Sequence, residues 1–322
     1  MVCNLEINDE CGGNMTQKKD HQRNRLAHRS ASGLMAIILI ATQWTGHPSG
    51  AQTRIRMESA RESSMSVTDS IDRAVFSICE GNGGDRKRTV PIDQIALQTP
   101  LALTHPQVVK GKARAQRLLP VAKRLLPAAL NQLGLTYQAG SISQELVNSR
   151  IRSVTAIEAN VADHDNASVR RYDPRAITFG TVFLAGLRSD EAMIAVLAHE
   201  LTHVVDGPDH LLQPLFSNLR ARASQLSGNP IQVRPAIELT CEMAGLYVLV
   251  QHLGGASKIK GKHQRLARAF QKNCVTYDLA DDRHLSPRQT LEMLLLLEPE
   301  LTRAVVKAEK RPSEKGGKRS SD

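Results

Sequence analysis

Residues 189–208, with the sequence SDEAMIAVLAHELTHVVDGP, decide the fold of this chain. Ser189 is a residue type that often caps a helix amino terminus, and the two acids after it suit the positive end of a helix dipole. Small and apolar side chains then predominate as far as Asp206. Gly207 and Pro208 end the pattern as a C-terminal glycine followed by a helix breaker. We therefore expect one buried helix between these two signals.

Three polar residues interrupt this apolar helix: His199, Glu200 and His203. At 100° per residue the two histidines lie about 40° apart on one face and one turn apart along the axis. Their imidazoles can therefore chelate one Zn²⁺, while Glu200 can reach a metal-activated water as a general base. The alternative is an amphipathic helix whose histidines make ordinary hydrogen bonds. Burial of three polar groups on one apolar helix favours the metal.

A second apolar helix, expected to run from Pro235 to Gly254, carries Glu238 and Glu242 on one face. The alternative interpretation is a solvated acidic stripe, but the neighbouring residues, AIELTCEMAGLYVLV, are almost wholly apolar. Acids on such a helix require a nearby cation to be stable. A catalytic zinc also needs a third protein ligand, which this helix can supply.

Several segments together resemble the HtpX-type zinc metallopeptidases, a family that includes the CAAX prenyl protease and the periplasmic protease BepA. These segments are the Asn166-Ala167 pair, residues 177–184, the HExxH helix at 189–203, and Glu238-x-x-x-Glu242 in place of the family ExxxD. The resemblance implies an α+β, mainly helical fold. It implies a zincin-like metallopeptidase domain with a small antiparallel sheet beside the HExxH helix.

The same resemblance implies roles for individual residues. His199, His203 and Glu238 would bind one Zn²⁺ per chain, and Glu200 would be the general base. Glu242 would support a ligand histidine, although the family has Asp at this position. The additional methylene of Glu changes the geometry of that support.

The family also carries a His-Pro pair and a downstream Arg close to the substrate oxyanion. Residues 282–288, DRHLSPR, are similar to this motif, although no Pro directly follows the histidine. His284 is therefore the expected donor to the transition state. Tyr247, Tyr277 and Arg283 are alternatives, because each could supply the positive end of a dipole there.

A strand is expected from Ala176 to Leu184, because this segment is rich in β-branched and aromatic residues. Metallopeptidases of the resembled kind hold an extended substrate as an added strand. An unpaired strand beside the zinc helix would position the scissile bond through main-chain hydrogen bonds. The alternative is an ordinary edge strand without a substrate role.

These features predict a zinc-dependent endopeptidase that hydrolyses protein or peptide bonds. The first alternative is a catalytically weak, metallopeptidase-like module that binds or chaperones proteins in the cell envelope. The second alternative is a basic DNA-binding or membrane-associated protein in which the HExxH sequence is incidental.

The charge distribution argues against a nucleic-acid partner. The 42 Lys and Arg exceed the 32 Asp and Glu by ten, but residues 1–51 hold five basic and four acidic residues, and residues 303–322 hold seven and three. The remaining chain therefore has 30 basic and 25 acidic residues, which is ordinary. Aromatic residues make up 3% of the chain, too few for a surface that stacks bases.

Residues 1–51 have the parts of a secretory signal: a basic segment, the apolar run Gly33–Thr42, and small residues at Ser49–Ala51. We therefore expect an exported protein, periplasmic or secreted, from which this leader is cleaved. The alternative is an uncleaved leader that tethers the protein to a membrane. No apolar run reaches the roughly 20 residues of a membrane span.

The remaining chain divides by composition. Residues 52–107 are linker-like, with one short helix expected near Ile71 to Cys79; residues 108–302 form the metallopeptidase domain; residues 303–322 are expected to be a disordered basic tail. Three cysteines follow the leader and allow at most one intramolecular disulfide, whose pairing remains open, between two of Cys79, Cys241 and Cys274.

Further local signals complete the expected elements. A helical pattern begins at Val108, and Pro120 and Pro127 are expected to break or kink it. Residues 154–157 are a candidate strand. Ser286 and the proline after it are expected to cap a third helix.

Overall fold

A computed structural model describes residues 66–81, 98–170, 172–255, 262–270, 273–274, 280 and 282–309. All of these residues fall within one compact unit. The expected leader at residues 1–51, including its cleavage site, lies outside the described residues, as do residues 310–322 of the expected tail.

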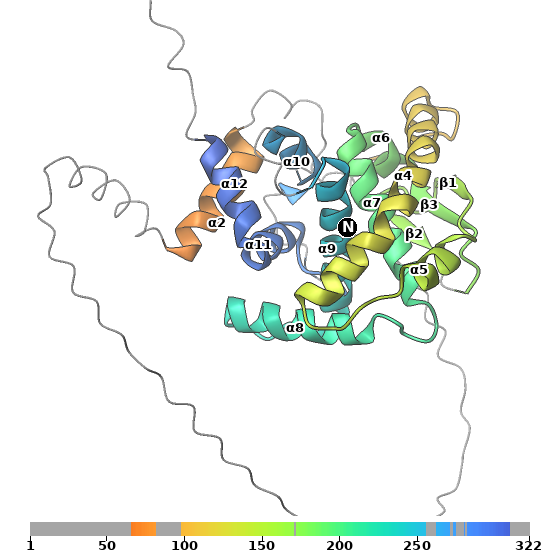
Figure 1. Cartoon of the computed structure of the whole chain (residues 1–322). Helices are drawn as coiled ribbons and strands as arrows, with labels where there is room; N and C mark the ends of the chain where they lie inside the picture. The colour runs from red at the N-terminus through yellow and green to blue at the C-terminus, as the bar shows by residue number, and fades with distance from the viewer. Residues whose placement is uncertain are drawn as a thin grey trace, which may run out of the picture. The chain divides into compact units, whose positions relative to one another are not determined.

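The described part of the chain is mainly helical and contains one small mixed sheet (Figure 1). The elements are α2 (Val67–Phe76), η1 (Ser77–Gly81), α4 (Pro106–Thr136), α5 (Gln144–Ile151), β1 (Ala156–Asn160), β2 (Ala167–Val169), β3 (Ala176–Gly180), α6 (Thr181–Gly186), α7 (Asp190–Asp206), α8 (Gln213–Ser227), α9 (Val233–His252), α10 (His263–Phe270), α11 (Pro287–Leu297) and α12 (Pro299–Glu309). The expectation of an α+β, mainly helical fold is therefore confirmed.

The sheet is not antiparallel, as the sequence led us to expect, but mixed. Its strand order is β1-β3-β2, with β3 parallel to β1 and antiparallel to β2. In this register Ile177 of β3 lies opposite both Ile157 of β1 and Val169 of β2. The strand expected to be at the edge is therefore the central one, and β2 is an edge strand among the described residues.

The expected strand at Ala176–Leu184 is wrong in its second half. The strand ends at Gly180, and helix α6 begins at Thr181. The carbonyl oxygen of His164 accepts hydrogen bonds of 2.9 Å from the amides of Val182 and Phe183. These amides therefore make no hydrogen bonds to a neighbouring strand of the described sheet. Their acceptor lies in a loop about 18 positions earlier in the chain, which the local sequence does not indicate.

Helix α4 is continuous, so the expected break at Pro120 and Pro127 does not occur. A proline inside a helix costs about 3 kcal/mol, because it removes one hydrogen bond and crowds the preceding turn. One face of α4 is fully buried at Ala122, Leu126 and Leu130. Tertiary packing of this long apolar face offsets the local cost of the prolines.

The two helices expected to carry the chemistry are present. Helix α7 has Ser189 as its N-cap, with the side chain accepting from the Ala192 amide, and it ends before Gly207 at a φ of 57°. Helix α9 begins at Val233, two residues before the expected Pro235, which therefore lies in the first turn. A proline is tolerated there because first-turn amides have no intrahelical partner.

The backbones of α7 and α9 lie close together. A Cβ atom placed on Gly245 of α9 would lie only 2.7 Å from the carbonyl oxygen of Ala195 in α7. Helix α7 also packs against α4, and strand β2 contacts α7. The HExxH helix is therefore enclosed on several sides, which explains why its polar residues are buried.

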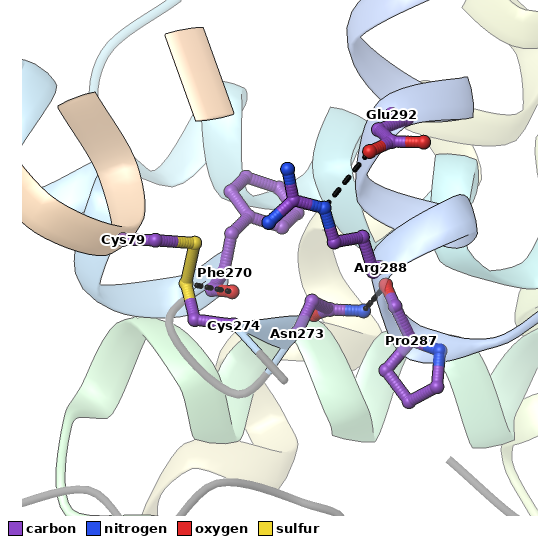
Figure 2. The surroundings of a disulfide bond; sticks show 7 residues. All are labelled: Cys79, Phe270, Asn273, Cys274, Pro287, Arg288 and Glu292. Carbon is purple, nitrogen blue, oxygen red and sulfur yellow. Dashed lines mark hydrogen bonds and ion pairs between the residues drawn. A yellow bond between two sulfur atoms is a disulfide. The ribbon is translucent and has the colours of Figure 1, made fainter. Parts of the chain in front are cut away.

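The segment before α4 belongs to the same compact unit. Helix α2 and the π-helical turn η1 form near the expected short helix, and α2 contacts α11 and α12. A disulfide joins Cys79 of η1 to Cys274 (Figure 2), whereas Cys241 is buried and free. Of the pairings that the sequence left open, the structure therefore contains the one between Cys79 and Cys274.

The carboxyl-terminal elements differ from expectation at one boundary. Helix α11 begins after Ser286, which forms a reciprocal capping box with Gln289 as expected for this N-cap. Helix α12 continues to Glu309, so residues 303–309 of the expected disordered tail are helical. Among the described residues, no helix is both long and apolar enough to cross a membrane.

Candidate metal centre

Helices α7 and α9 supply the polar groups of one buried cluster. His199, Glu200 and His203 lie on α7 and are at most 9% exposed. Glu238 and Glu242 lie on α9, where the Glu238 side chain is 12% exposed. The neighbouring side chains on both helices are apolar and buried, so water gives these groups little solvation.

Three ligand-type atoms form an almost equilateral triangle. The Nε2 atoms of His199 and His203 lie 3.3 Å apart. The Oε2 atom of Glu238 lies 3.2 Å from Nε2 of His199 and 3.4 Å from Nε2 of His203. Helix α7 thus supplies two corners of this triangle, and helix α9 supplies the third.

This spacing matches what a tetrahedral metal ion requires. Ligand atoms about 2.0–2.1 Å from a common Zn²⁺ at tetrahedral angles lie about 3.3–3.4 Å from one another. The two nitrogens and one oxygen are spaced as that geometry requires. They are also the donor types that a catalytic zinc site uses.

Cys241 offers a further ligand atom. Its thiol and the imidazole nitrogens of His199 and His203 all lie within 4.8 Å of one another, so these three buried residues could hold a metal ion. The Sγ atom lies 3.7 Å from Nδ1 of His203, the ring nitrogen on the opposite side from Nε2. Burial and then the surrounding carboxylates raise the pKa of the Cys241 thiol.

Glu242 approaches the other nitrogen of a histidine. Its Oε1 atom lies 3.4 Å from Nδ1 of His199. A carboxylate in this position sets the tautomer and orientation of an imidazole whose Nε2 faces a metal. Glu242 therefore approaches His199 on the side of the ring opposite Nε2.

The electrostatics of the pair formed by His199 and Glu238 reflect their mutual contact. Burial opposes protonation of His199, but hydrogen bonds to Glu238 and Glu242 and the nearby Glu200 charge raise its pKa to about 10. Burial likewise disfavours the charged form of Glu238, but the two histidines hold its pKa well below the usual range. The cluster therefore favours a cation at its centre, either a proton or a metal.

Glu200 is completely buried next to His199 on α7. Its charge influences both His199 and Cys241, so the carboxylate lies within electrostatic reach of the cluster.

A pocket opens onto this cluster and contains His284. Its wall is formed by residues of α7, α9, α11 and the segments before α11: His199, Pro235, Glu238, Leu239, Glu242, Asn273, His284, Leu285 and Thr290. His284 is buried in this wall, near two of the expected ligands. The structure therefore brings His284 to the cluster from a segment 46 positions after Glu238.

The alternative donors are placed differently. The hydroxyl of Tyr247 donates to Glu298 over 2.7 Å and does not line the pocket. Arg283 does not line the pocket either. Tyr277 lies outside the described residues.

Asn273 was missed by the sequence reasoning. No motif of the sequence distinguishes this asparagine. Only the fold brings Asn273 into the wall beside His284 and Glu242.

No protein-family model, no curated protein and no solved structure matches this chain.

Proposed function

We propose that this chain is a zinc-dependent endopeptidase of the HtpX-type class, with one Zn²⁺ held by His199, His203 and Glu238. The observation that carries the proposal is the triangle of Nε2, Nε2 and Oε2 atoms spaced 3.2–3.4 Å apart. Cys241 is the weaker third ligand, because its Sγ atom meets Nδ1 of His203, the ring nitrogen on the far side from the triangle.

When bound, Zn²⁺ would polarise both a water molecule and the substrate carbonyl group. Glu200 accepts the proton of the attacking water and passes it to the leaving amine. Its complete burial strengthens its electrostatic interaction with that proton, because little solvent screens it.

His284 donates a hydrogen bond to the carbonyl oxygen as negative charge develops there. Glu242 holds the imidazole of His199 through Nδ1, so that Nε2 keeps its direction. These two residues approach from different elements, which supports a site that orients both the ligand and the substrate.

Protein or peptide substrates also need a surface to bind. Among the described residues, β2 is an edge strand and contacts the HExxH helix. An extended substrate could add to this edge through main-chain hydrogen bonds. In the proposal β2 thus replaces β3, which is paired on both sides.

Export of the enzyme is part of the proposal. The disulfide between Cys79 and Cys274 supports it, because disulfides persist mainly in oxidising compartments. A periplasmic or secreted enzyme, cleaved from its leader, agrees with that chemistry.

The decisive experiment compares wild type with Glu200→Gln for zinc content and casein hydrolysis. We expect one zinc per chain in both proteins and a fall in hydrolysis of several orders of magnitude in the variant. Glu292→Gln on the surface of α11 is the matched control and should keep full activity. Equal activity of wild type and Glu200→Gln would refute the mechanism. Zinc without any hydrolysis by wild type would instead support a metal-containing binding module.

A further inference from the structure

Asn273 lies in the same pocket wall as His199, Glu238 and His284, yet the proposed mechanism does not use it. It reaches this wall from the segment between α10 and α11. The residue is only 3% exposed, so its polar side chain is almost entirely removed from bulk water.

The position of the Asn273 amide is restrained on two sides. Its Nδ2 atom donates a 3.0 Å hydrogen bond to the carbonyl oxygen of Pro287, the first residue of α11. The next residue, Cys274, is joined to Cys79 by the disulfide, and Figure 2 shows these contacts together. The side chain is thus held from one direction by α11 and its backbone from another by η1.

The other half of the amide is unused. Among the described residues, Oδ1 of Asn273 is a buried atom without a hydrogen-bond partner. Buried carbonyl oxygens in proteins are almost always hydrogen-bonded, and Asn273 lines the pocket, so its unused acceptor points to a donor from outside the described chain. The held Nδ2 prevents the amide from rotating to exchange the two atoms.

We propose that Asn273 binds the substrate by accepting a hydrogen bond at Oδ1 from one main-chain N–H of the bound peptide. This inference rests on the proposed peptidase function. A peptide offers such a neutral donor at almost every residue, whatever its side chains. Asn273 therefore fixes the depth and direction of the substrate without selecting its sequence.

The first test is kinetic. Asn273→Ala is expected to raise KM for a casein-derived peptide about five- to tenfold with kcat within about twofold, because a binding contact is lost without loss of chemistry. Asn218→Ala is the matched control: Asn218 also donates to main-chain carbonyls, but it lies on α8 away from the pocket. It should leave KM and kcat unchanged.

The second test identifies the donor and needs no turnover. A fluorescein-labelled casein peptide is bound to zinc-loaded Glu200→Gln, and its main-chain N–H groups are replaced by ester oxygens one at a time. One ester should weaken binding about fivefold in Glu200→Gln and have no further effect in Glu200→Gln/Asn273→Ala. Such non-additivity reports a direct contact, which a merely structural role would not produce.

The outcomes separate the two proposals. Suppose that wild type hydrolyses casein, that Asn273→Ala has the same KM as wild type, and that no ester substitution depends on Asn273 for its effect. This result overturns the role of Asn273 but not the peptidase function. If one ester substitution weakens binding only when Asn273 is present, but wild type does not hydrolyse casein, the role of Asn273 is supported and the peptidase function is refuted. Absence of peptide binding to zinc-loaded Glu200→Gln, together with absence of casein hydrolysis by wild type, overturns both.

Discussion

Nε2 of His199 lies 3.2 Å from Oε2 of Glu238, although 39 positions separate the two residues in the chain. The contact exists because α7 and α9 are antiparallel: Ala195 of α7 meets Gly245 of α9, while His203 meets Glu238. The absence of a side chain at Gly245 thus determines how closely the two sets of ligands can approach.

Glu238→Gln should abolish stoichiometric zinc binding, whereas Glu242→Gln should weaken it only about 10- to 100-fold. The physical reason is that Glu238 completes the ligand triangle, while Glu242 acts through Nδ1 of His199. Metal titration with a competing chelator measures both affinities. The reverse order of effects would show that the third ligand has been assigned to the wrong carboxylate.

Gly245→Ala should destabilise the fold by about 1–3 kcal/mol and also weaken zinc binding, because its Cβ would meet Ala195 in α7. Gly111→Ala is the control, since its Cβ would lie 2.6 Å from the carbonyl oxygen of Leu184, between α4 and α6. Urea unfolding and zinc titration are measured for both. Equal loss of zinc affinity in the two variants would contradict a specific spacing role for Gly245.

Removal of zinc should lower the free energy of unfolding, since the ligands come together only in the folded chain. A ligand present at 100 times its Kd stabilises the native state by about 2.7 kcal/mol. Urea unfolding with excess zinc and with chelator measures the difference. Glu238→Gln should show almost no difference, and an equal response of this variant would place the metal elsewhere.

Replacement of Cys79 and Cys274 by serine should lower the free energy of unfolding by about 2–5 kcal/mol, because the bond closes a long loop in the unfolded chain. Denaturation with and without dithiothreitol provides the internal control. Wild type in reductant should fall to the stability of the variant, and the variant itself should not respond. Insensitivity of wild type to complete reduction would contradict the prediction.

Glu298 should make the fold less stable as pH rises. Burial raises its pKa above the ordinary value of 4.5, despite hydrogen bonds from Tyr247 and Tyr137. The native state therefore binds the proton more tightly than the unfolded chain, so this stabilisation is fully present below pH 4.5 and is lost as pH rises through the raised pKa.

Glu298→Gln removes this titration while keeping an acceptor for both tyrosines. Its unfolding free energy relative to wild type should therefore increase from pH 4.5 toward neutral pH. Urea unfolding across that range measures the difference, and exposed Glu300→Gln is the control. A constant difference at all pH values would show that Glu298 does not titrate as inferred.

Local sequence was sufficient to predict the helices that carry the chemistry. Helix α7 begins after Ser189 and ends before Gly207, as these capping signals predict. His199 and His203, four positions apart, share one face of the helix. These features depend on neighbours within about a turn, so they follow from the chain itself.

The sheet was less predictable. The half of the expected strand after Gly180 is helical because the carbonyl of His164 binds its amides. The mixed pairing of β3 likewise depends on two partners that approach from elsewhere in the chain. The prolines of α4 are tolerated because distant side chains cover its face. In each case a tertiary contact outweighs a local preference of a few kcal/mol.

The candidate site divides in the same way. Which residues can bind a metal was readable from HExxH and from two glutamates on an apolar helix. Which atoms meet was decided by the approach of α7 to α9. The fold brought the expected donor His284 into the pocket wall and placed beside it Asn273, which no motif had indicated. Residue chemistry and helical period are properties of the local chain, whereas a distance across 39 or more positions exists only after the core has packed.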